Sequence, residues 1–408
     1  MVLTKEEASL GQVFITWELG AGFGHLATMR SVSMALLVLG HRVAIAARDL
    51  THFHRFFSDL DVQVFQAPYF RGTFLNSFNP PSTFPHILYN CCCGNTDTFV
   101  SLAKAWQNLF DLIKPDVALF DHSPTAIFAT RDRSFYRATI NNGFFAPPNE
   151  SPLPSWRSQS ENDLSRFASD ETRVLDLLNI SARRLSATQL GQVSDLYSEL
   201  NENFLFTYPE LDHFPNRRHA NYVGTWESSS GNTPHWPTSN GPRVFAYLKK
   251  FPNLPVLLYH LARLQLPTVI YAPGAITDEF LRKFSASQSN VRVVNSTINL
   301  KRVAVECDFA ITNGTHGTVA TMLLAGKPTL NFPLLLEQRI LSDRVCAGGM
   351  GLGASPDDQS RVKPALQNML ETATLSEHAL QFRQKYIHHD GVDRVLQDLN
   401  SVMSSDNR

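Results

Sequence analysis

The hydrophobic residues of this chain are grouped in short blocks that alternate between strand-like and helix-like spacing. Residues 13–17 form an apolar run typical of a buried strand, and residues 42–47 contain a second one. Between them, apolar side chains recur at helical spacing at Met29, Val32, Leu36 and Leu39. Gly40 is a residue type that commonly follows the end of a helix. This order predicts a βαβ unit with two parallel strands.

The same alternation returns in the second half of the chain, with strands expected at 243–248, 268–271, 291–294, 309–312 and 329–332. Residues 225–242 separate the halves and contain a Ser-Ser-Ser-Gly stretch and repeated prolines, which is typical of a linker. A chain of 408 residues also exceeds the size at which one hydrophobic core usually keeps growing. We therefore expect an α/β protein with two domains, residues 1–224 and 243–385, and a C-terminal helix at 386–408 that crosses back to the first domain.

The composition narrows the class of ligand. Lys and Arg number 36 and Asp and Glu number 37, and this balance argues against a protein that acts on nucleic acid or on an anionic membrane surface. The five cysteines include no CxxC pair, so we expect reduced thiols and no metal site. The N-terminus lacks the pattern of a secretion signal, and no 18 apolar residues run together. These features predict a cytoplasmic protein without an integral membrane segment, which binds a small or locally recognised ligand.

A glycine-rich turn follows the first strand and contains Gly20, Gly22 and Gly24. The dinucleotide-binding fingerprint requires a glycine where His25 stands and an acidic residue about 20 positions further on, and this sequence has neither. His25 is a titratable group at the carboxyl end of the first strand, where open α/β sheets bind ligands. It is either a functional residue or a histidine that only caps the start of the next helix.

Asp121 also ends a strand, which we expect at residues 116–121. Its carboxylate can orient a histidine across the edge of the sheet, or it can cap the helix that Pro124 opens. Both interpretations fit the local sequence. His122, beside Asp121, is the next candidate for a base after His25.

A second glycine-containing turn occupies residues 313–318, between a strand and a helix. The first N–H groups of a helix have no partner within the helix and carry the positive end of its dipole, so such a turn favours phosphate. The alternative is an ordinary turn whose glycines only permit close packing. Lys249 and Lys250 follow the strand at 243–248, and they are either solvated or face the same phosphate groups.

Together, the two turns resemble those of the inverting nucleotide-sugar glycosyltransferases of GT-B fold, the superfamily of UDP-glucuronosyl-, plant secondary-metabolite, macrolide and glycopeptide glycosyltransferases. The family pattern GHxxP…RGHxV is similar to Gly24-His25 followed by LGHRV at residues 39–43. The family pattern HGGxGT…AGxP…P…(D/E)Q is similar to NGTHGT at 313–318, AGKP at 325–328, Pro333 and Glu337-Gln338. The resemblance covers most of the chain and implies two Rossmann-like α/β domains that face each other across a cleft.

The resemblance implies a role for each matching residue. His25 would be the general base, and Asp121 would be the carboxylate that orients it. The nucleobase, diphosphate and sugar of a UDP- or dTDP-sugar donor would be bound by Gly24, Lys249, Thr297, Ile298, Asn313, Gly314, Thr315, His316, Gly317, Thr318, Glu337 and Gln338. The implied reaction is a single displacement by a hydroxyl group of a small-molecule acceptor, and it needs no metal and no cofactor other than the donor.

Three positions depart from the family pattern. Asn313 stands where the family usually has a histidine that contacts the diphosphate, Thr315 replaces a glycine, and Lys249-Lys250 replaces a Gly-Ser turn. A lysine can supply the cationic contact that an asparagine cannot. The sequence leaves two further functions open, a non-hydrolysing sugar-nucleotide epimerase and a nucleotide-binding auxiliary protein without turnover.

The acceptor is the least defined part of this prediction. Residues 68–97 and 143–170 contain prolines and aromatic residues, and we expect them to form long surface loops that shape a pocket. This composition favours an apolar, hydroxylated acceptor.

Overall fold

The computed structural model describes residues 11–157, 161–226, 231–275, 277, 280, 284 and 287–405. The chain divides into two compact units. The first unit comprises Met1–Tyr208, Phe214–Trp226 and Asp390–Arg408, and the second comprises Pro209–His213 and Glu227–His389.

The short segment Pro209–His213 does not belong to the domain at 1–224 that the sequence predicted. It includes the 3₁₀ helix η2 (Pro209–Leu211), which packs on α12 (Leu336–Ala347) of the second unit. The Glu210 carboxylate accepts hydrogen bonds of 2.6 Å from Nζ of Lys385 and 2.6 Å from the hydroxyl of Tyr386. These contacts between residues far apart in the sequence attach the segment to the second unit.

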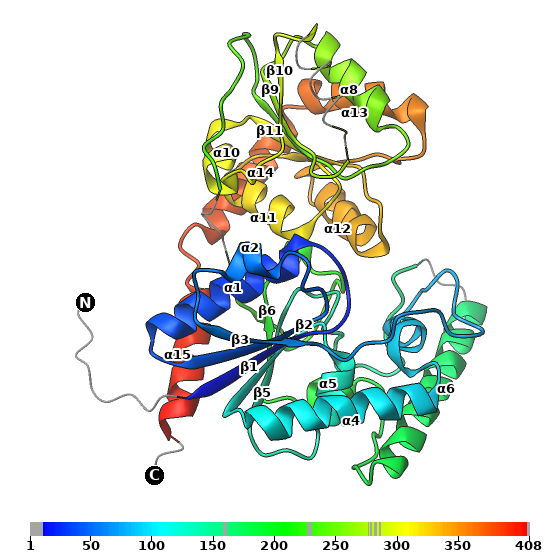
Figure 1. Ribbon diagram of the computed structural model, residues 1–408. Coiled ribbons are helices and arrows are strands. Elements are labelled where there is room, and N and C mark those ends of the chain that lie inside the picture. Colours follow the sequence, from blue (N-terminus) through cyan, green and yellow to red (C-terminus); the bar gives the residue numbers. More distant parts are fainter. Residues whose placement is uncertain are drawn as a thin grey trace. The chain divides into compact units, whose positions relative to one another are not determined.

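The first unit is built on a sheet of seven parallel strands in the order β3-β2-β1-β4-β5-β6-β7 (Figure 1). The strands are β1 (Gln12–Trp17), β2 (Arg42–Ala47), β3 (Val62–Gln66), β4 (Val117–Asp121), β5 (Tyr136–Asn141), β6 (Glu202–Leu205) and β7 (Asn221–Tyr222). The direction of the strand order reverses between β1 and β4, where Trp17 is in register with Asp121. Open α/β sheets bind ligands at the carboxyl ends of the strands at such a reversal.

Helices cover both faces of this sheet, as Figure 1 shows for α1 and α4. One face packs against α1 (Phe23–Val38), α2 (Phe53–Phe57) and α15 (Gly391–Ser405). The opposite face shares a core with α3 (Phe84–Leu88), the π-helix η1 (Tyr89–Cys93), α4 (Thr96–Ile113), α5 (Pro124–Ala129), α6 (Glu161–Arg184) and α7 (Asp195–Ser198). β1, β2 and β4 are buried almost throughout, which explains their nearly continuous apolar sequences, whereas the edge strand β3 has glutamines at exposed positions.

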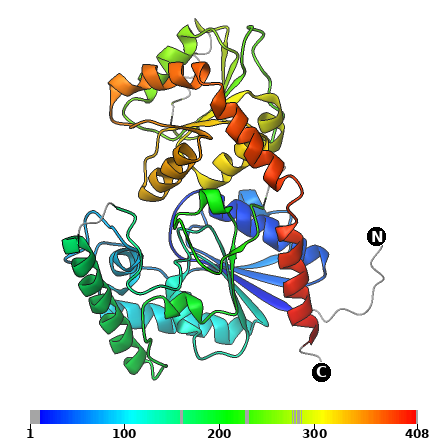
Figure 2. The ribbon, with the colours of Figure 1, turned by 180° about the vertical axis from the view of Figure 1, so that it is seen from behind.

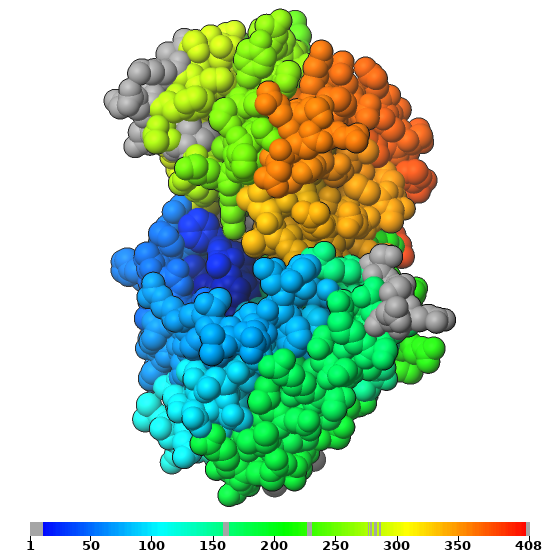
Figure 3. Space-filling model, turned by 90° about the vertical axis from the view of Figure 1, so that its right-hand side faces the viewer, coloured from blue at the N-terminus to red at the C-terminus, as the bar shows by residue number. Residues whose placement is uncertain are grey.

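The expectation of a continuous loop at 68–97 is wrong in its second half, because α3 and η1 occupy Phe84–Cys93. Phe84, Leu88 and Tyr89 are buried in the core on that side of the sheet, and this burial stabilises helical structure that the local composition did not indicate. The second expected loop is also shorter than predicted, since α6 begins at Glu161. Figure 3 shows α6 in green on the surface, beside the light-blue and cyan segments that include α3 and α4.

The C-terminal helix α15 packs on the sheet of the first unit, along its dark-blue strands (Figure 2). Its buried side chains are Val395, Leu399 and Met403, which recur at helical spacing. Oδ1 of Asn400 lies 3.2 Å from Nε2 of the buried His41. The last helix is therefore part of the hydrophobic core of the first unit.

The second unit has a sheet of six parallel strands in the order β10-β9-β8-β11-β12-β13. They are β8 (Val244–Tyr247), β9 (Thr268–Tyr271), β10 (Val291–Val294), β11 (Phe309–Thr312), β12 (Thr329–Asn331) and β13 (Gly351–Gly353). The strand order reverses between β8 and β11, where Tyr247 is in register with Thr312. The residues after these two strands, Lys249 and the turn at 313–318, are thereby neighbours.

Helices also cover both faces of the second sheet. One face shares a core with α8 (Leu254–Arg263) and α13 (Gln359–Glu371), and the other with α10 (Leu300–Glu306) and α11 (His316–Leu324). α14 (Thr374–Tyr386) packs against α11. In the described part of the chain, no helix is both long and apolar enough to span a membrane.

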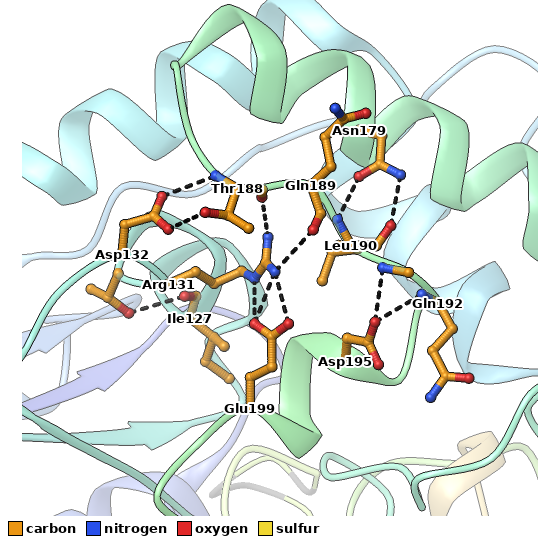
Figure 4. Close-up of polar contacts among 12 residues, drawn as sticks. Ile127, Arg131, Asp132, Asn179, Thr188, Gln189, Leu190, Gln192, Asp195 and Glu199 are labelled. Atoms are coloured by element: carbon orange, nitrogen blue, oxygen red, sulfur yellow. Dashed lines mark hydrogen bonds and ion pairs between the residues drawn. The ribbon is translucent and has the colours of Figure 1, made fainter.

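A polar network secures the irregular segment before β6 (Figure 4). The guanidinium group of Arg131, at the end of α5, donates to both carboxylate oxygens of Glu199 at 2.9 Å each and also to the carbonyl of Thr188. Asp132 accepts hydrogen bonds from the backbone N–H of Thr188 at 3.1 Å and from its hydroxyl at 2.6 Å. The side chain of Arg131 is only 3 % exposed, whereas that of its partner Glu199 is 42 % exposed, so the pair reaches from the interior to the surface.

Candidate active site

His25 and Asp121, which the sequence proposed as partners, are in direct contact. His25 lies in the first turn of α1, and its Nδ1 is 2.9 Å from Oδ2 of Asp121 at the end of β4. Their side chains are 10 % and 4 % exposed. When the Asp121 carboxylate accepts the proton on Nδ1, Nε2 of a neutral His25 is the nitrogen with the lone pair. α1 follows Gly22 and has no side-chain cap, and α5 follows Ser123, so neither residue acts as a helix cap.

Aromatic side chains restrict the ring of His25. The indole of Trp17 stacks on it, with 5.0 Å between ring centroids and 19° between ring planes, and the ring of Phe145 lies at 5.5 Å. Nε1 of Trp17 donates a hydrogen bond of 2.8 Å to the carbonyl of Leu19, which fixes the indole in turn. Packing therefore determines the direction in which Nε2 of His25 points.

Gly20 gives His25 the space for this position. Its φ is +84°, in the region that only glycine adopts without strain. A Cβ atom on this residue would lie 2.6 Å from Nε2 of His25 and 3.5 Å from Nδ1 of His122. The two imidazole rings thus approach the same point above the backbone of the glycine-rich turn.

Glu18 is a buried acidic residue at this strand end that the sequence reasoning missed. Its side chain is fully buried, and Oε2 accepts a hydrogen bond of 2.9 Å from the backbone N–H of Thr125 in α5. Burial raises the pKa of Glu18 to about 7, against the opposing effect of its hydrogen bonds. A carboxyl group directly after an apolar strand, at the edge where ligands bind, was the available signal.

The turn after β11 brings two glycines to the start of α11. Gly314 has a φ of +75°, and its N–H donates to the hydroxyl of Thr312 at 2.8 Å. A Cβ atom on Gly314 would lie 2.9 Å from the carbonyl oxygen of Gln338, whereas one on Gly317 would have no atom within 4 Å. The start of α11 is therefore open at Gly317, and the first N–H groups of a helix, which have no partner within the helix, favour an anion.

The amide of Asn313 is used within the sheet. Its Oδ1 accepts a hydrogen bond of 2.6 Å from the backbone N–H of Lys249, and its Nδ2 donates one of 2.8 Å to the carbonyl of Phe332. The residue is buried and joins the chain after β8, β11 and β12. The side chain of Lys249 is exposed beside this junction. Asparagine at this position therefore stabilises the turn through its backbone contacts.

His316, the first residue of α11, is buried and uncharged near neutral pH. Burial lowers the pKa of its imidazole to about 4, and the nearby Asp212 opposes this shift only in part. Thr318 is also buried, and Thr315 is the N-cap residue of α11 without a side-chain cap. These residues can offer a diphosphate neutral hydrogen-bond donors but no positive charge.

The remaining predicted donor residues differ in how available they are. Gln338 is buried and caps its own helix, because Oε1 accepts from the N–H of Leu334 at 2.8 Å and of Leu335 at 3.2 Å. Glu337 is half-buried. The side chain of Ile298 is in the core of the second unit and 4 % exposed, so only its backbone can contact a nucleobase.

Thr297 and Gly24 were also predicted to contact the donor. Thr297 is half-buried, and its carbonyl accepts a hydrogen bond of 2.8 Å from the N–H of Asn232. Gly24 lies in the first turn of α1, and a Cβ atom there would have no atom within 4 Å. Among the described residues, no group of three or more His, Cys, Asp and Glu side chains could hold a metal ion.

Two parallel α/β sheets, each with a strand-order reversal, define the class of this protein as GT-B, and the predicted fold is confirmed by solved structures. A glycotransferase of kitacinnamycin aligns over 96 % of this chain and 99 % of its own, with a TM-score of 0.70 and 15 % sequence identity. The glycosyltransferase VinC, solved in complex with dTDP, aligns over 96 % of this chain and 99 % of its own, with a TM-score of 0.63 and 16 % identity.

Sequence comparison gives one curated relative and no family. The UDP-glucosyltransferase avaP of Aspergillus versicolor is 21 % identical in an alignment that covers 53 % of this chain. The match spans 61 % of the length of that relative. No family model matches the chain. The comparisons thus establish the fold, and the activity has to be argued from the site.

Proposed function

We propose that this protein is an inverting, metal-independent glycosyltransferase, which moves a sugar from a UDP- or dTDP-sugar to a hydroxyl group of a small, apolar acceptor. The observation that carries this proposal is the 2.9 Å contact between His25 and Asp121, at the strand-order reversal of a GT-B sheet. An imidazole oriented by a buried carboxylate is a common arrangement for a general base.

In the proposed reaction, Nε2 of His25 removes the proton of the acceptor hydroxyl. The acceptor oxygen attacks the anomeric carbon of the donor, and the bond from this carbon to the diphosphate breaks on the opposite face of the sugar, so the configuration inverts. The Asp121 carboxylate stabilises the imidazolium that forms on His25. The apolar rings of Trp17 and Phe145 exclude water and favour an apolar acceptor beside the base.

We further propose that the second unit binds the donor diphosphate at the turn 313–318. The N–H groups at the start of α11 would donate hydrogen bonds to its oxygens, and Lys249 would supply the cation that neither Asn313 nor His316 provides. Glu337 and the amide nitrogen of Gln338 would hydrogen-bond the sugar hydroxyls. The complex of VinC with dTDP and the UDP-glucosyltransferase avaP support a nucleoside diphosphate of this kind.

Donor binding is tested by a graded pair of substitutions at Gly317. Since a Cβ atom there meets no protein atom, both Gly317→Ala and Gly317→Val should fold. We expect Gly317→Val to weaken UDP or dTDP binding at least tenfold, or ~1.4 kcal/mol, and Gly317→Ala to weaken it less. Lys249→Ala should weaken diphosphate binding more than nucleoside binding, and Lys250→Ala is its matched control. Unchanged nucleotide affinity in folded Gly317→Val would rule out this turn as the diphosphate site.

The chemical step is tested at His25 with UDP-glucose and dTDP-glucose, a panel of phenolic and polyketide acceptors, and product detection by mass spectrometry. We expect His25→Ala to leave the nucleotide affinity unchanged and to lower the turnover by ~10²–10⁴-fold. The fall in the rate of the wild type at acidic pH should also be absent from this variant. Substitution of the exposed His54 by alanine is the control. Full turnover of His25→Ala with the wild-type pH profile would exclude His25 as the base. Conversion of the donor to an epimer without any acceptor would indicate an epimerase instead.

A further inference from the structure

His122 has an unusual backbone conformation directly after Asp121. Its φ is +46°, in the left-handed region that costs most residues about 1 kcal/mol or more. The carbonyl of His122 accepts a hydrogen bond of 3.0 Å from the N–H of Leu19, in the turn that leads to His25. The two chain segments that carry the base and its carboxylate are thus joined at this residue.

The ring of His122 supports the ring that contacts His25. It stacks on Phe145 with 3.9 Å between ring centroids and 23° between ring planes, and Phe145 in turn lies 5.5 Å from His25. Since Trp17 also stacks on His25, four rings form one continuous series, in the order Trp17, His25, Phe145, His122. A smaller side chain in place of His122 would therefore allow Phe145 to shift, and the ring of His25 would lose part of its support.

A positive charge on His122 would oppose the reaction, because His25 becomes positively charged when it takes the acceptor proton. His122 is 4 % exposed, and neither of its ring nitrogens has a hydrogen-bond partner among the described residues. Burial lowers the pKa of His122 well below its usual value, and the charges of His25 and Arg48 lower it further. This argues against His122 as the alternative base that the sequence allowed, because a base of that kind holds a proton poorly.

We propose that His122 is a positioning residue for the base: its ring, through Phe145, fixes the orientation of His25 toward Asp121. This inference rests on the proposed function of His25. A positioning role explains why a buried imidazole whose nitrogens make no hydrogen bonds occupies a strained backbone position. The ring of His122 serves for packing, and its nitrogens serve no function in this role.

Two substitutions of His122 test whether its aromatic ring or its ring nitrogens are required. His122→Phe keeps an aromatic ring against Phe145, and His122→Asn removes the ring but keeps a residue that tolerates the left-handed conformation. We expect His122→Asn to lower kcat by about 10- to 100-fold without a change in the KM of the donor. His122→Phe should restore kcat to within about threefold of the wild type, with an unchanged pH profile. A Phe variant as slow as the Asn variant would overturn the proposal, as would an Asn variant with full activity.

A spectroscopic measurement tests the same inference without turnover. Nδ1 of His25 lies 2.9 Å from Oδ2 of Asp121. The proton in this hydrogen bond should give a low-field NMR resonance. We expect this resonance in the wild type and in His122→Phe, and its loss or broadening in His122→Asn. Its persistence in the Asn variant would refute the positioning role. If the resonance behaves as expected while no acceptor is ever glycosylated, the proposed function fails and the positioning role stands. If His122→Asn does not fold, loss of the resonance in His122→Phe alone is sufficient to refute the inference.

Discussion

The buried carboxyl of Glu18 makes the stability of this protein depend on pH in a predictable direction. Burial raises the pKa of Glu18 from 4.5 to about 7 in the folded protein. Between these values the unfolded chain loses the proton while the folded chain keeps it, so the free energy of unfolding falls as the pH rises through this window. Each pKa unit corresponds to about 1.4 kcal/mol, so the full effect is on the order of 3 kcal/mol.

The substitution Glu18→Gln removes this dependence. Glutamine keeps the oxygen that accepts the hydrogen bond of Thr125 and has no proton to lose. We therefore expect Glu18→Gln to be more stable relative to the wild type at pH 8 than at pH 5, by about 2.5 kcal/mol. Urea unfolding at both pH values, followed by tryptophan fluorescence, measures this difference, since Trp17 adjoins Glu18 in the sequence.

Substitution of the exposed Glu150 by glutamine provides the matched control. A constant difference between the wild type and Glu18→Gln from pH 5 to pH 8 would refute the reasoning. In that case Glu18 would be ionised in the folded protein, and its burial would be offset by contacts stronger than the hydrogen bond from Thr125.

Three further outcomes follow from individual contacts. Gly20→Ala places a Cβ atom 2.6 Å from Nε2 of His25 in a strained conformation, so we expect a loss of about 1–2 kcal/mol in thermal unfolding and a turnover at least tenfold lower with unchanged nucleotide affinity. Arg131→Met leaves the carbonyls of Thr188 and Gln189 without the guanidinium that donates to them and should cost about 1–3 kcal/mol in urea unfolding, and an unchanged midpoint would contradict the role of this network. Asn313→Leu leaves the N–H of Lys249 unpaired, so thermal shift should show lower stability and a weaker response to UDP or dTDP; a normal response would show that the turn does not depend on this amide.

Local patterns predicted the elements of the site but not how they meet. The apolar runs at β1 and β4 are evident because these strands are buried on both faces, and a residue after such a run must lie at a sheet edge. His25 and Asp121 were found in this way. That β1 and β4 are neighbours, with Trp17 in register with Asp121, depends on the order of the strands, which the sequence near either strand does not specify.

The sequence by itself determined the alternation of strands and helices, the two glycine-containing turns and the residue types available for acid–base chemistry, because periodicity and backbone freedom are local properties. Only the tertiary structure decided which of these groups are charged, paired or buried. Glu18, His122 and His316 have pKa values moved by burial, and Asn313 is occupied by backbone groups from two other segments. Such properties depend on contacts between residues about 20 to more than 100 positions apart, and no local pattern contains them.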